Sequence, residues 1–67
     1  MKKWYAVLRS EDDDDWGYGS HNKKVAAKMV RAERRLGYKD SYIAVIDVTN
    51  GDKYATCIDV IHDVRHM

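Results

Sequence analysis

The 67-residue chain contains no proline, no phenylalanine and only one cysteine, Cys57. A single cysteine excludes an internal disulfide and any zinc site built from several cysteines, and it is typical of a reducing, intracellular setting. No apolar run approaches the roughly 18 residues that a membrane span needs, and no signal-peptide pattern is present. We therefore expect a cytoplasmic protein that has no contact with a membrane.

A strong net charge is also lacking. The chain has 12 basic and 11 acidic residues and a formal charge of +1, so no global field draws it to nucleic acid or to an anionic membrane. The charges are nevertheless unevenly placed. Residues 11–15 carry five negative charges, whereas residues 23–35 carry six positive charges and one negative charge. This separation defines two candidate surfaces, one acidic and one basic.

The composition indicates one small globular domain, residues 1–67. Apolar residues make up 45% of the chain, which excludes a mainly disordered protein. A domain of this length buries only about 60% of the surface of its unfolded chain, so its stability margin is thin. All its aromatic residues are Trp or Tyr, which keep a polar tip, and several should lie at the rim of the core or on a binding surface.

The pattern of apolar residues predicts an α+β domain in the order β-α-β-β, with a three-stranded sheet packed against one amphipathic helix. Strands are expected over residues 3–9, 41–48 and 53–64, where β-branched and aromatic residues are frequent. The helix should begin after an N-cap at Ser20 and end before Gly37. Asn50-Gly51 is a strong hairpin signal between the last two strands.

A helix between two strands normally makes a right-handed crossover, which would place the first strand parallel to the second and the third antiparallel to it. The helical period puts an apolar stripe on one side of the helix, and Ala27 interrupts the basic face opposite. The stripe contains Val25, Ala26, Met29, Val30, Ala32 and Leu36. One helix covers one face of a sheet. The other face, expected to carry Tyr5, Val7, Ile43 and Val45, could be buried in a homodimer or against a partner.

The acidic loop, residues 11–18, admits three interpretations. Its carboxylates could stabilise the N-terminus of the following helix through the helix dipole. Asp13, Asp15 and Gly17 are similar to the opening of a calcium-binding loop, but the twelfth position from Asp13 is Lys24 where an EF-hand needs glutamate. The third interpretation is an exposed surface that binds a basic groove of a partner. Its residues would be Glu11, Asp12, Asp13, Asp14, Asp15, Trp16 and Tyr18.

The basic face of the predicted helix is a second candidate surface. It could contact phosphates of a nucleic acid or a protein partner, or it could simply be solvated. It lacks the Asn, Gln, Ser and Thr that usually accompany base-reading side chains, which favours binding without sequence specificity. Its residues are Lys23, Lys24, Lys28, Arg31, Arg34 and Arg35.

No arrangement typical of an enzyme, a metal site or a cofactor site is evident, and we expect none of the three. His62 and His66 lie in a predicted strand and tail, where a spacing of four does not bring two ligands together. His21 could act as a general base, but nothing in the sequence orients it. Cys57 is expected to be a small buried hydrophobe, and no glycine-rich phosphate loop is present.

Three resemblances bear on function. WYAVLRSEDDDDWGYG (residues 4–19) resembles the opening of HicB-type antitoxins, although those proteins continue with a second strand. GSHN (residues 19–22) resembles the GSHH of HicA-type RNA-cleaving toxins, in a different order of elements, and no catalytic residue is carried over. The fullest resemblance, through WYAV, DWGYGS and YIAVIDV, is to small uncharacterised proteins of bacteriophages and prophages.

The phage resemblance implies a class of proteins that often bind and inhibit host proteins, including anti-CRISPR and other counter-defence inhibitors. The sequence therefore predicts a small non-enzymatic protein-binding domain, a phage-encoded inhibitor or modulator of a bacterial protein or ribonucleoprotein in the host cytoplasm. Two alternatives stay open. One is a nucleic-acid-binding regulator that uses the basic helix face, and the other is a component of a toxin-antitoxin pair.

Overall fold

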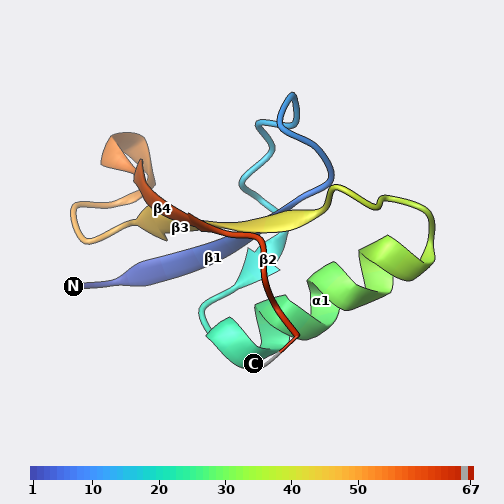
Figure 1. Cartoon of the computed structure of the whole chain (residues 1–67). Coiled ribbons are helices and arrows are strands. Elements are labelled where there is room, and N and C mark those ends of the chain that lie inside the picture. Colours follow the sequence, from blue (N-terminus) through green and yellow to red (C-terminus); the bar gives the residue numbers. More distant parts are fainter. Residues whose placement is uncertain (66) are drawn as a thin grey trace.

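The computed structural model describes residues 1–65 and 67. Its elements in chain order are β1 Lys3–Leu8, β2 Gly19–Ser20, α1 Lys23–Arg35, β3 Tyr42–Asp47, the short 3-10 helix η1 Asp52–Tyr54 and β4 Thr56–Ile61. The strands form one antiparallel sheet in the order β2-β1-β3-β4, and α1 lies against one face of it (Figure 1). The α+β class is confirmed. The sheet has four strands and not the predicted three, since β2 was not predicted.

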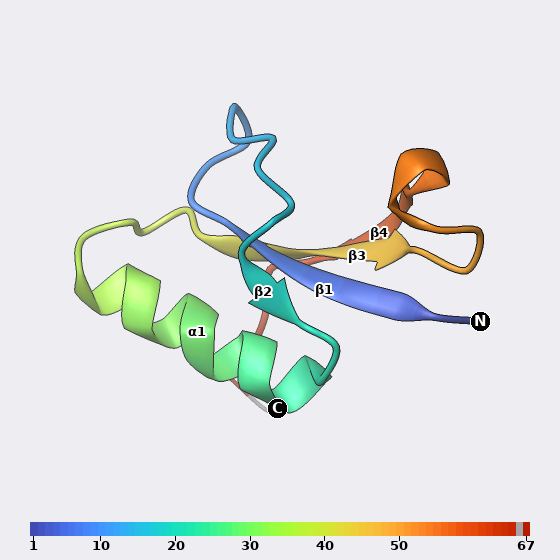
Figure 2. The same ribbon diagram turned by 180° about the vertical axis from the view of Figure 1, so that it is seen from behind.

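The predicted direction of the first strand is wrong, because β1 runs antiparallel to β3, with Leu8 opposite Tyr42 and Lys3 opposite Asp47. The cause is the connection 9–18, which reverses the chain before the helix begins. β2 then returns along β1, and α1 starts beside the beginning of β1 (Figure 2). The helix ends beside the end of β1, so β3 enters the sheet opposite Leu8 and runs back.

β2 is only two residues long, and its position depends on Gly19. Tyr5 pairs with Ser20 and Ala6 pairs with Gly19 across the two strands. A Cβ atom on Gly19 would lie 2.1 Å from the carbonyl oxygen of Tyr5. A glycine inside a strand often marks such a close approach of two backbones. The missing side chain therefore allows the chain to lie against β1 before it turns into α1.

The two ends of α1 are fixed by polar and glycine signals. Asn22, rather than the predicted Ser20, is the N-cap, and its side-chain oxygen accepts hydrogen bonds from the backbone N–H groups of Lys24 and Val25. Ser20 belongs to β2, and its hydroxyl accepts the N–H of Asn22 instead. The predicted stop at Gly37 is confirmed, because this glycine has φ of 110° just beyond the last helical turn.

The buried face of α1 is rotated from the predicted one. Ala26, Ala27 and Val30 are fully buried, whereas Val25 and Leu36 are 43% and 73% exposed. The placement of Ala27 on the basic face was wrong, as was the placement of Val25 and Leu36 in the core. Alanine fits both a core and a surface position, so Ala27 does not indicate which face of the helix is buried.

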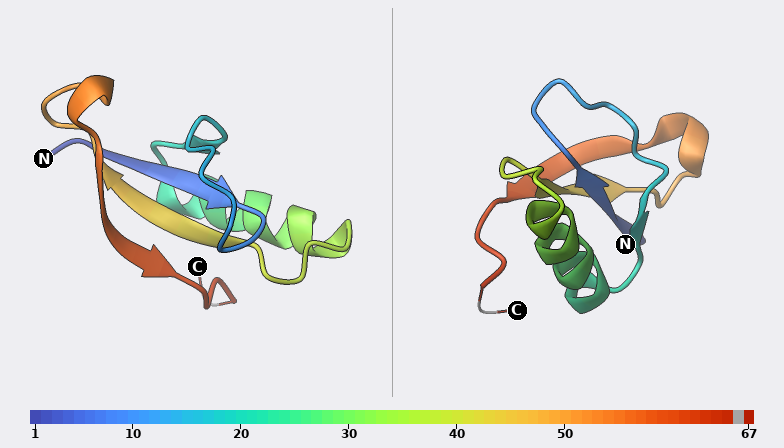
Figure 3. Two further views of the ribbon diagram at one scale, coloured as in Figure 1. Left: turned by 90° about the horizontal axis from the view of Figure 1, so that it is seen from above. Right: turned by 90° about the vertical axis from the view of Figure 1, so that its right-hand side faces the viewer.

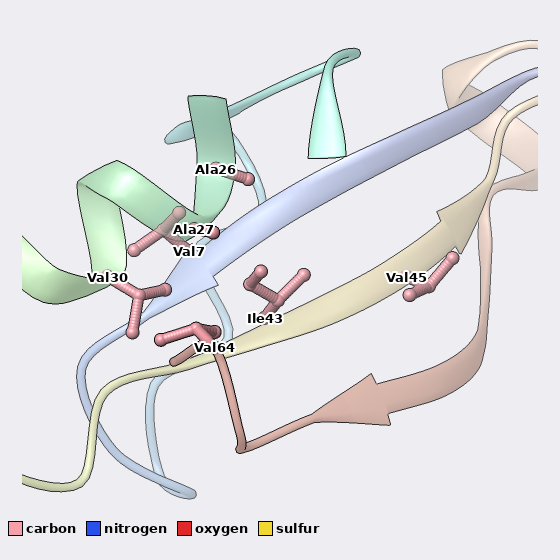
Figure 4. Packing of buried hydrophobic residues seen from close by; sticks show 7 residues of the cluster. All are labelled: Val7, Ala26, Ala27, Val30, Ile43, Val45 and Val64. Carbon is pink, nitrogen blue, oxygen red and sulfur yellow. The ribbon is translucent and has the colours of Figure 1, made fainter. Parts of the chain in front are cut away.

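The core beneath α1 combines residues of β1, β3, the helix and the segment after β4, and contains Val7, Ala26, Ala27, Val30, Ile43, Val45 and Val64 (Figure 4). The sheet residues Val7, Ile43 and Val45 were predicted on the uncovered face. This prediction is wrong, because all three belong to the cluster on the helix side of the sheet. Tyr5, predicted with them, also packs against this cluster.

The opposite sheet face carries a second cluster of buried residues, formed by Ala6, Leu8, Tyr42, Ala44 and Ile46. The connection 9–18 and the β3–β4 connection both project from this side, away from α1 (Figure 3). Trp16 from the first connection and Ala55 from the second pack against the cluster. The face without a helix is therefore partly covered by two loops, which stand as separate walls on the sheet.

The predicted hairpin between β3 and β4 is confirmed as an antiparallel pair, but not as a two-residue turn. Its connection spans residues 48–55 and includes η1. Gly51 has φ of 93°, and no described residue other than a glycine has positive φ, so Asn50 does not take the predicted turn conformation. β4 also contains a bulge, because Asp59 lies opposite Val45 and Cys57 opposite Ile46. The extra residue breaks the alternation predicted for this strand.

Candidate functional site

Two of the five acids in the acidic loop accept hydrogen bonds from backbone N–H groups of the connection 9–18. The Asp13 carboxylate accepts hydrogen bonds from the backbone N–H groups of Arg9 at 3.1 Å and Asp15 at 3.0 Å. Asp15 in turn accepts the N–H of Gly17 at 2.9 Å. These bonds, chiefly the one from Asp15, lower the pKa of Asp13 below its ordinary value of 3.8. Asp13 and Asp15 therefore shape the loop.

This role predicts a pH dependence. Because folding lowers the pKa of Asp13, the ionised carboxylate stabilises the fold above its ordinary pKa of 3.8, and this contribution is lost as the pH falls through the lowered value. An Asp13→Asn variant should thus be less stable than the wild type near neutral pH, and the difference should shrink in acid. Urea unfolding across this range measures it. Asp14→Asn is the control, and an equal pH-dependent loss in that variant would contradict the role of Asp13.

The other three acids, Glu11, Asp12 and Asp14, are exposed. Among the residues that the structure describes, none of them forms an ion pair with a basic side chain. Asp13 and Asp15 line a surface hollow together with Glu33, which belongs to the C-terminal half of α1 and not to its N-terminus. This position does not fit the helix-dipole interpretation, which places the acids at the helix N-terminus. Their charges face solvent from a loop whose backbone is fixed.

Trp16 anchors the loop to the sheet. Its carbonyl oxygen accepts the indole N–H of Trp4 at 2.6 Å, and the side chain packs, half-buried, on the sheet face. The Trp4 ring meets the His21 ring edge-on, with centroids 4.8 Å apart. His21 Nδ1 donates to the carbonyl oxygen of Lys3 at 3.0 Å. Tyr18 is 48% exposed, so of the two aromatic residues predicted in the loop surface it is the more accessible.

A cleft lies between the two loops that project from this sheet face. Its volume is about 420 Å³, within the range of ordinary ligand sites. Ile46 of β3 and Trp4 of β1 supply its sheet side, the acidic loop supplies one wall and the β3–β4 connection supplies the other. The cleft is lined by Trp4, Trp16, Gly17, His21, Ile46, Val48, Asp52 and Ala55.

The chemistry of the cleft is aromatic with a single formal charge. Both tryptophans of the chain line it, and Asp52 is the one acid among the lining residues that the structure describes. No Lys or Arg is among the described residues of the lining. Trp4 and Asp52 were not predicted as site residues, and His21 was considered only as a general base. They lie in three segments that come together only after the loops fold, and no local signal joins them.

The structure divides the basic residues of α1 into two groups. The guanidinium of Arg31 donates to the carbonyl oxygen of Val64 at 2.9 Å, and that of Arg34 donates to the carbonyl oxygens of Ser41 and His62. These two arginines therefore tie the helix to the start of β3 and to the segment after β4. The predicted residues that stay exposed are Lys23, Lys24, Lys28 and Arg35.

The remaining polar candidates do not form a site. His62 stacks on Tyr42 with ring centroids 4.9 Å apart, and His66 lies outside the described residues. Cys57 is exposed on the edge strand β4, so the prediction of a buried cysteine is wrong. Within residues 1–65 and 67, no three His, Cys, Asp or Glu side chains are grouped so that they could hold a metal ion.

Comparisons of the chain with models of known protein families, with curated proteins and with solved structures gave no match. In the part of the chain that the structure describes, α1 is too short and too polar to cross a membrane.

Proposed function

We propose that this chain is a small non-enzymatic protein-binding domain that recognises a basic region of a partner with the sheet face opposite α1. The observation that carries the proposal is the cleft between two projecting loops, one of which presents three carboxylates without ion-pair partners among the described residues. Concave surfaces with half-buried aromatic side chains are frequent centres of protein interfaces, and adjacent charges direct the encounter.

In this proposal the partner is a bacterial protein or ribonucleoprotein, and the domain acts in the host cytoplasm as an inhibitor or modulator. The phage-encoded, anti-CRISPR-type inhibitor stays a prediction from the resemblance of the sequence. A homodimer would use the same sheet face, so it competes with the partner for the cleft.

The exposed cations of α1 favour a second candidate function, binding to the phosphates of a nucleic acid. Lys24, Lys28 and Arg35 lie within about three turns of one helix and form no ion pair with any described acid. The helix packs against one face of the sheet, whereas the two loops that line the cleft project from the other face (Figure 1). The two candidate functions can therefore be separated by changing one surface at a time.

Two matched charge-reversal variants test these proposals. In the first, Glu11, Asp12 and Asp14 are changed to lysine, which leaves the hydrogen bonds of Asp13 and Asp15 in place. In the second, Lys24, Lys28 and Arg35 are changed to glutamate. Tagged proteins are used to capture partners from a bacterial lysate with and without nuclease, and the affinity of the recovered partner is then measured. Circular dichroism confirms that both variants fold.

For a protein partner at the cleft face, capture should survive nuclease, and the loop variant should bind about tenfold more weakly or worse. The helix variant should bind like the wild type. Three results together would instead support nucleic-acid binding by α1. Capture would disappear with nuclease, the helix variant would lose binding, and affinity would fall steeply with salt. An unaffected loop variant would remove the acidic loop from the interface.

A further inference from the structure

We propose that the cleft receives an arginine side chain of the protein partner, held between the indole rings of Trp4 and Trp16 and paired with the carboxylate of Asp52. This inference rests on the proposed function and specifies its chemistry. It assigns a role to Trp4 and Asp52, which were not predicted as site residues, and a specific role to Trp16, which was predicted as part of the acidic loop surface.

The first observation is the aromatic lining. Both tryptophans line the cleft, and the position of the Trp4 ring is fixed because its N–H is donated to the carbonyl oxygen of Trp16. Trp4 also contacts His21, which is fixed by its own bond to Lys3. Indole is the best side chain for cation–π contacts, and the planar guanidinium of arginine can stack on it while still donating hydrogen bonds at its edge.

The second observation is the sign of the charge. Asp52 is the one acid among the described lining residues, none of which is a lysine or an arginine, and the ring of His21 is held by Lys3 and Trp4. The backbone N–H of Gly17 is already donated to Asp15, so it is used within the loop. An anion would meet repulsion from Asp52. A neutral apolar group would cover the carboxylate without giving it a partner, which is unfavourable. A cation satisfies both the rings and the carboxylate.

The third observation connects the cleft to the rest of the proposed interface. Trp16 and Gly17, which form one wall, belong to the same loop as the outward acids Glu11, Asp12 and Asp14. A partner segment that inserts one arginine into the cleft would bring its neighbouring basic residues towards these acids. This continuity favours a side chain of a protein over a free organic cation.

The chain has only two tryptophans and both line the cleft, so the two indole N–H signals of a ¹H–¹⁵N NMR spectrum report on it directly. The probes are N-acetyl-arginine amide and N-acetyl-citrulline amide, which have almost the same shape and differ in charge. Trp4→Phe and Trp16→Phe variants assign the two signals. Protein variants Asp52→Asn and Asp40→Asn are then titrated with the same probes, and Asp40 serves as an exposed acid outside the cleft.

We expect the arginine probe to shift both indole signals saturably, with a dissociation constant on the order of millimolar, and the citrulline probe to leave them unchanged. Asp52→Asn should weaken binding roughly three- to fivefold, as for a solvent-accessible ion pair, and Asp40→Asn should match the wild type. Equal shifts with both probes, or no shift with either, would overturn the proposal.

The same experiment separates this inference from the proposed function. If the arginine probe leaves the indole signals unchanged while the acidic-loop variant still loses a protein partner, the cleft is not an arginine site and the binding face stands. If the probe binds as expected but no nuclease-resistant partner is captured, the cleft recognises guanidinium and the protein-binding function fails.

Discussion

Replacing Gly19 with alanine is expected to lower the free energy of unfolding by about 2–3 kcal/mol, a large part of the roughly 3–10 kcal/mol available to a domain of this size. The added Cβ would lie 2.1 Å from the carbonyl oxygen of Tyr5 and 2.9 Å from Cα of Ala6. Both atoms belong to the backbone of β1, so they cannot move aside as a flexible side chain would. β2 would have to separate from β1.

The consequences should extend beyond β2, because this short strand sets the start of α1 and the end of the connection 9–18. The backbone N–H of Val7 donates to the carbonyl oxygen of Tyr18 at 2.7 Å just before β2, and this bond should also be weakened. Urea unfolding followed by tryptophan fluorescence measures the loss.

Gly17→Ala is the matched control for Gly19→Ala. Its Cβ would lie 3.1 Å from a side-chain oxygen of Asp15, which can shift slightly, so we expect a change below about 1 kcal/mol. Equal stability of the Gly19→Ala variant and the wild type would contradict the close packing of β2 on β1.

Replacing Arg9 with methionine is expected to lower the melting temperature by roughly 10 °C or more. Glu33 is only 5% exposed although it carries a carboxylate, and Arg9 Nε donates to this carboxylate at 2.9 Å. The hydrogen bond to Glu33 raises the pKa of Arg9 above its ordinary value. Without Arg9, the carboxylate of Glu33 would stay buried with no cation, which is the costly way to break such a pair.

Arg9 is also held in place by Tyr38. Its guanidinium carbon lies 4.2 Å from the centre of the Tyr38 ring, and Nη1 donates to the hydroxyl at 3.2 Å. This contact joins the end of β1 to the segment after α1. The cation therefore connects three elements, although its own side chain is 51% exposed.

A second substitution separates the loss of the charge from the loss of packing. In the Arg9→Met background, Glu33→Gln removes the uncompensated charge and should recover part of the melting temperature, and the double-mutant cycle measures the coupling. Arg65→Met breaks the exposed ion pair with Asp63 and should change the melting temperature very little. If Arg9→Met resembles Arg65→Met, the pair with Glu33 does not stabilise the fold.

Several elements could be predicted because their signals are local. The alternation in residues 3–9 gave the first strand, the continuous apolar run gave β3, and Gly37 marked the end of the helix. The antiparallel pairing of β3 and β4 followed from Asn50-Gly51 and the two flanking strands. In each case a few neighbouring residues carry both the conformational preference and the pattern of burial.

The errors share a different cause, since they depend on contacts between distant segments. A two-residue strand has no periodicity, so β2 was not predicted. Without β2, the prediction took the chain directly from the first strand into the helix. The direction of β1 relative to β3 and the assignment of the sheet faces were then both reversed. The rotation of α1 was ambiguous because Ala27 fits either a core or a surface position.

The candidate site shows the same limit. The sequence analysis selected the acidic loop as a unit, because its charge is visible in the sequence. It could not separate Asp13 and Asp15, which hold the backbone, from Glu11, Asp12 and Asp14, which face solvent. The position of Asp52 and Trp16 at one cleft could not be predicted either. The two residues belong to different loops, which only the folded sheet brings together.

The footprint of the captured partner on the ¹⁵N-labelled domain tests directly whether the partner binds the sheet face opposite α1. Binding should perturb the indole signals of Trp4 and Trp16 and the amide signals of residues 11–17 and 52–55. The amides around Lys24, Lys28 and Arg35 should remain unchanged. A footprint on α1, with both indole signals unaffected, would contradict the assignment of the binding face.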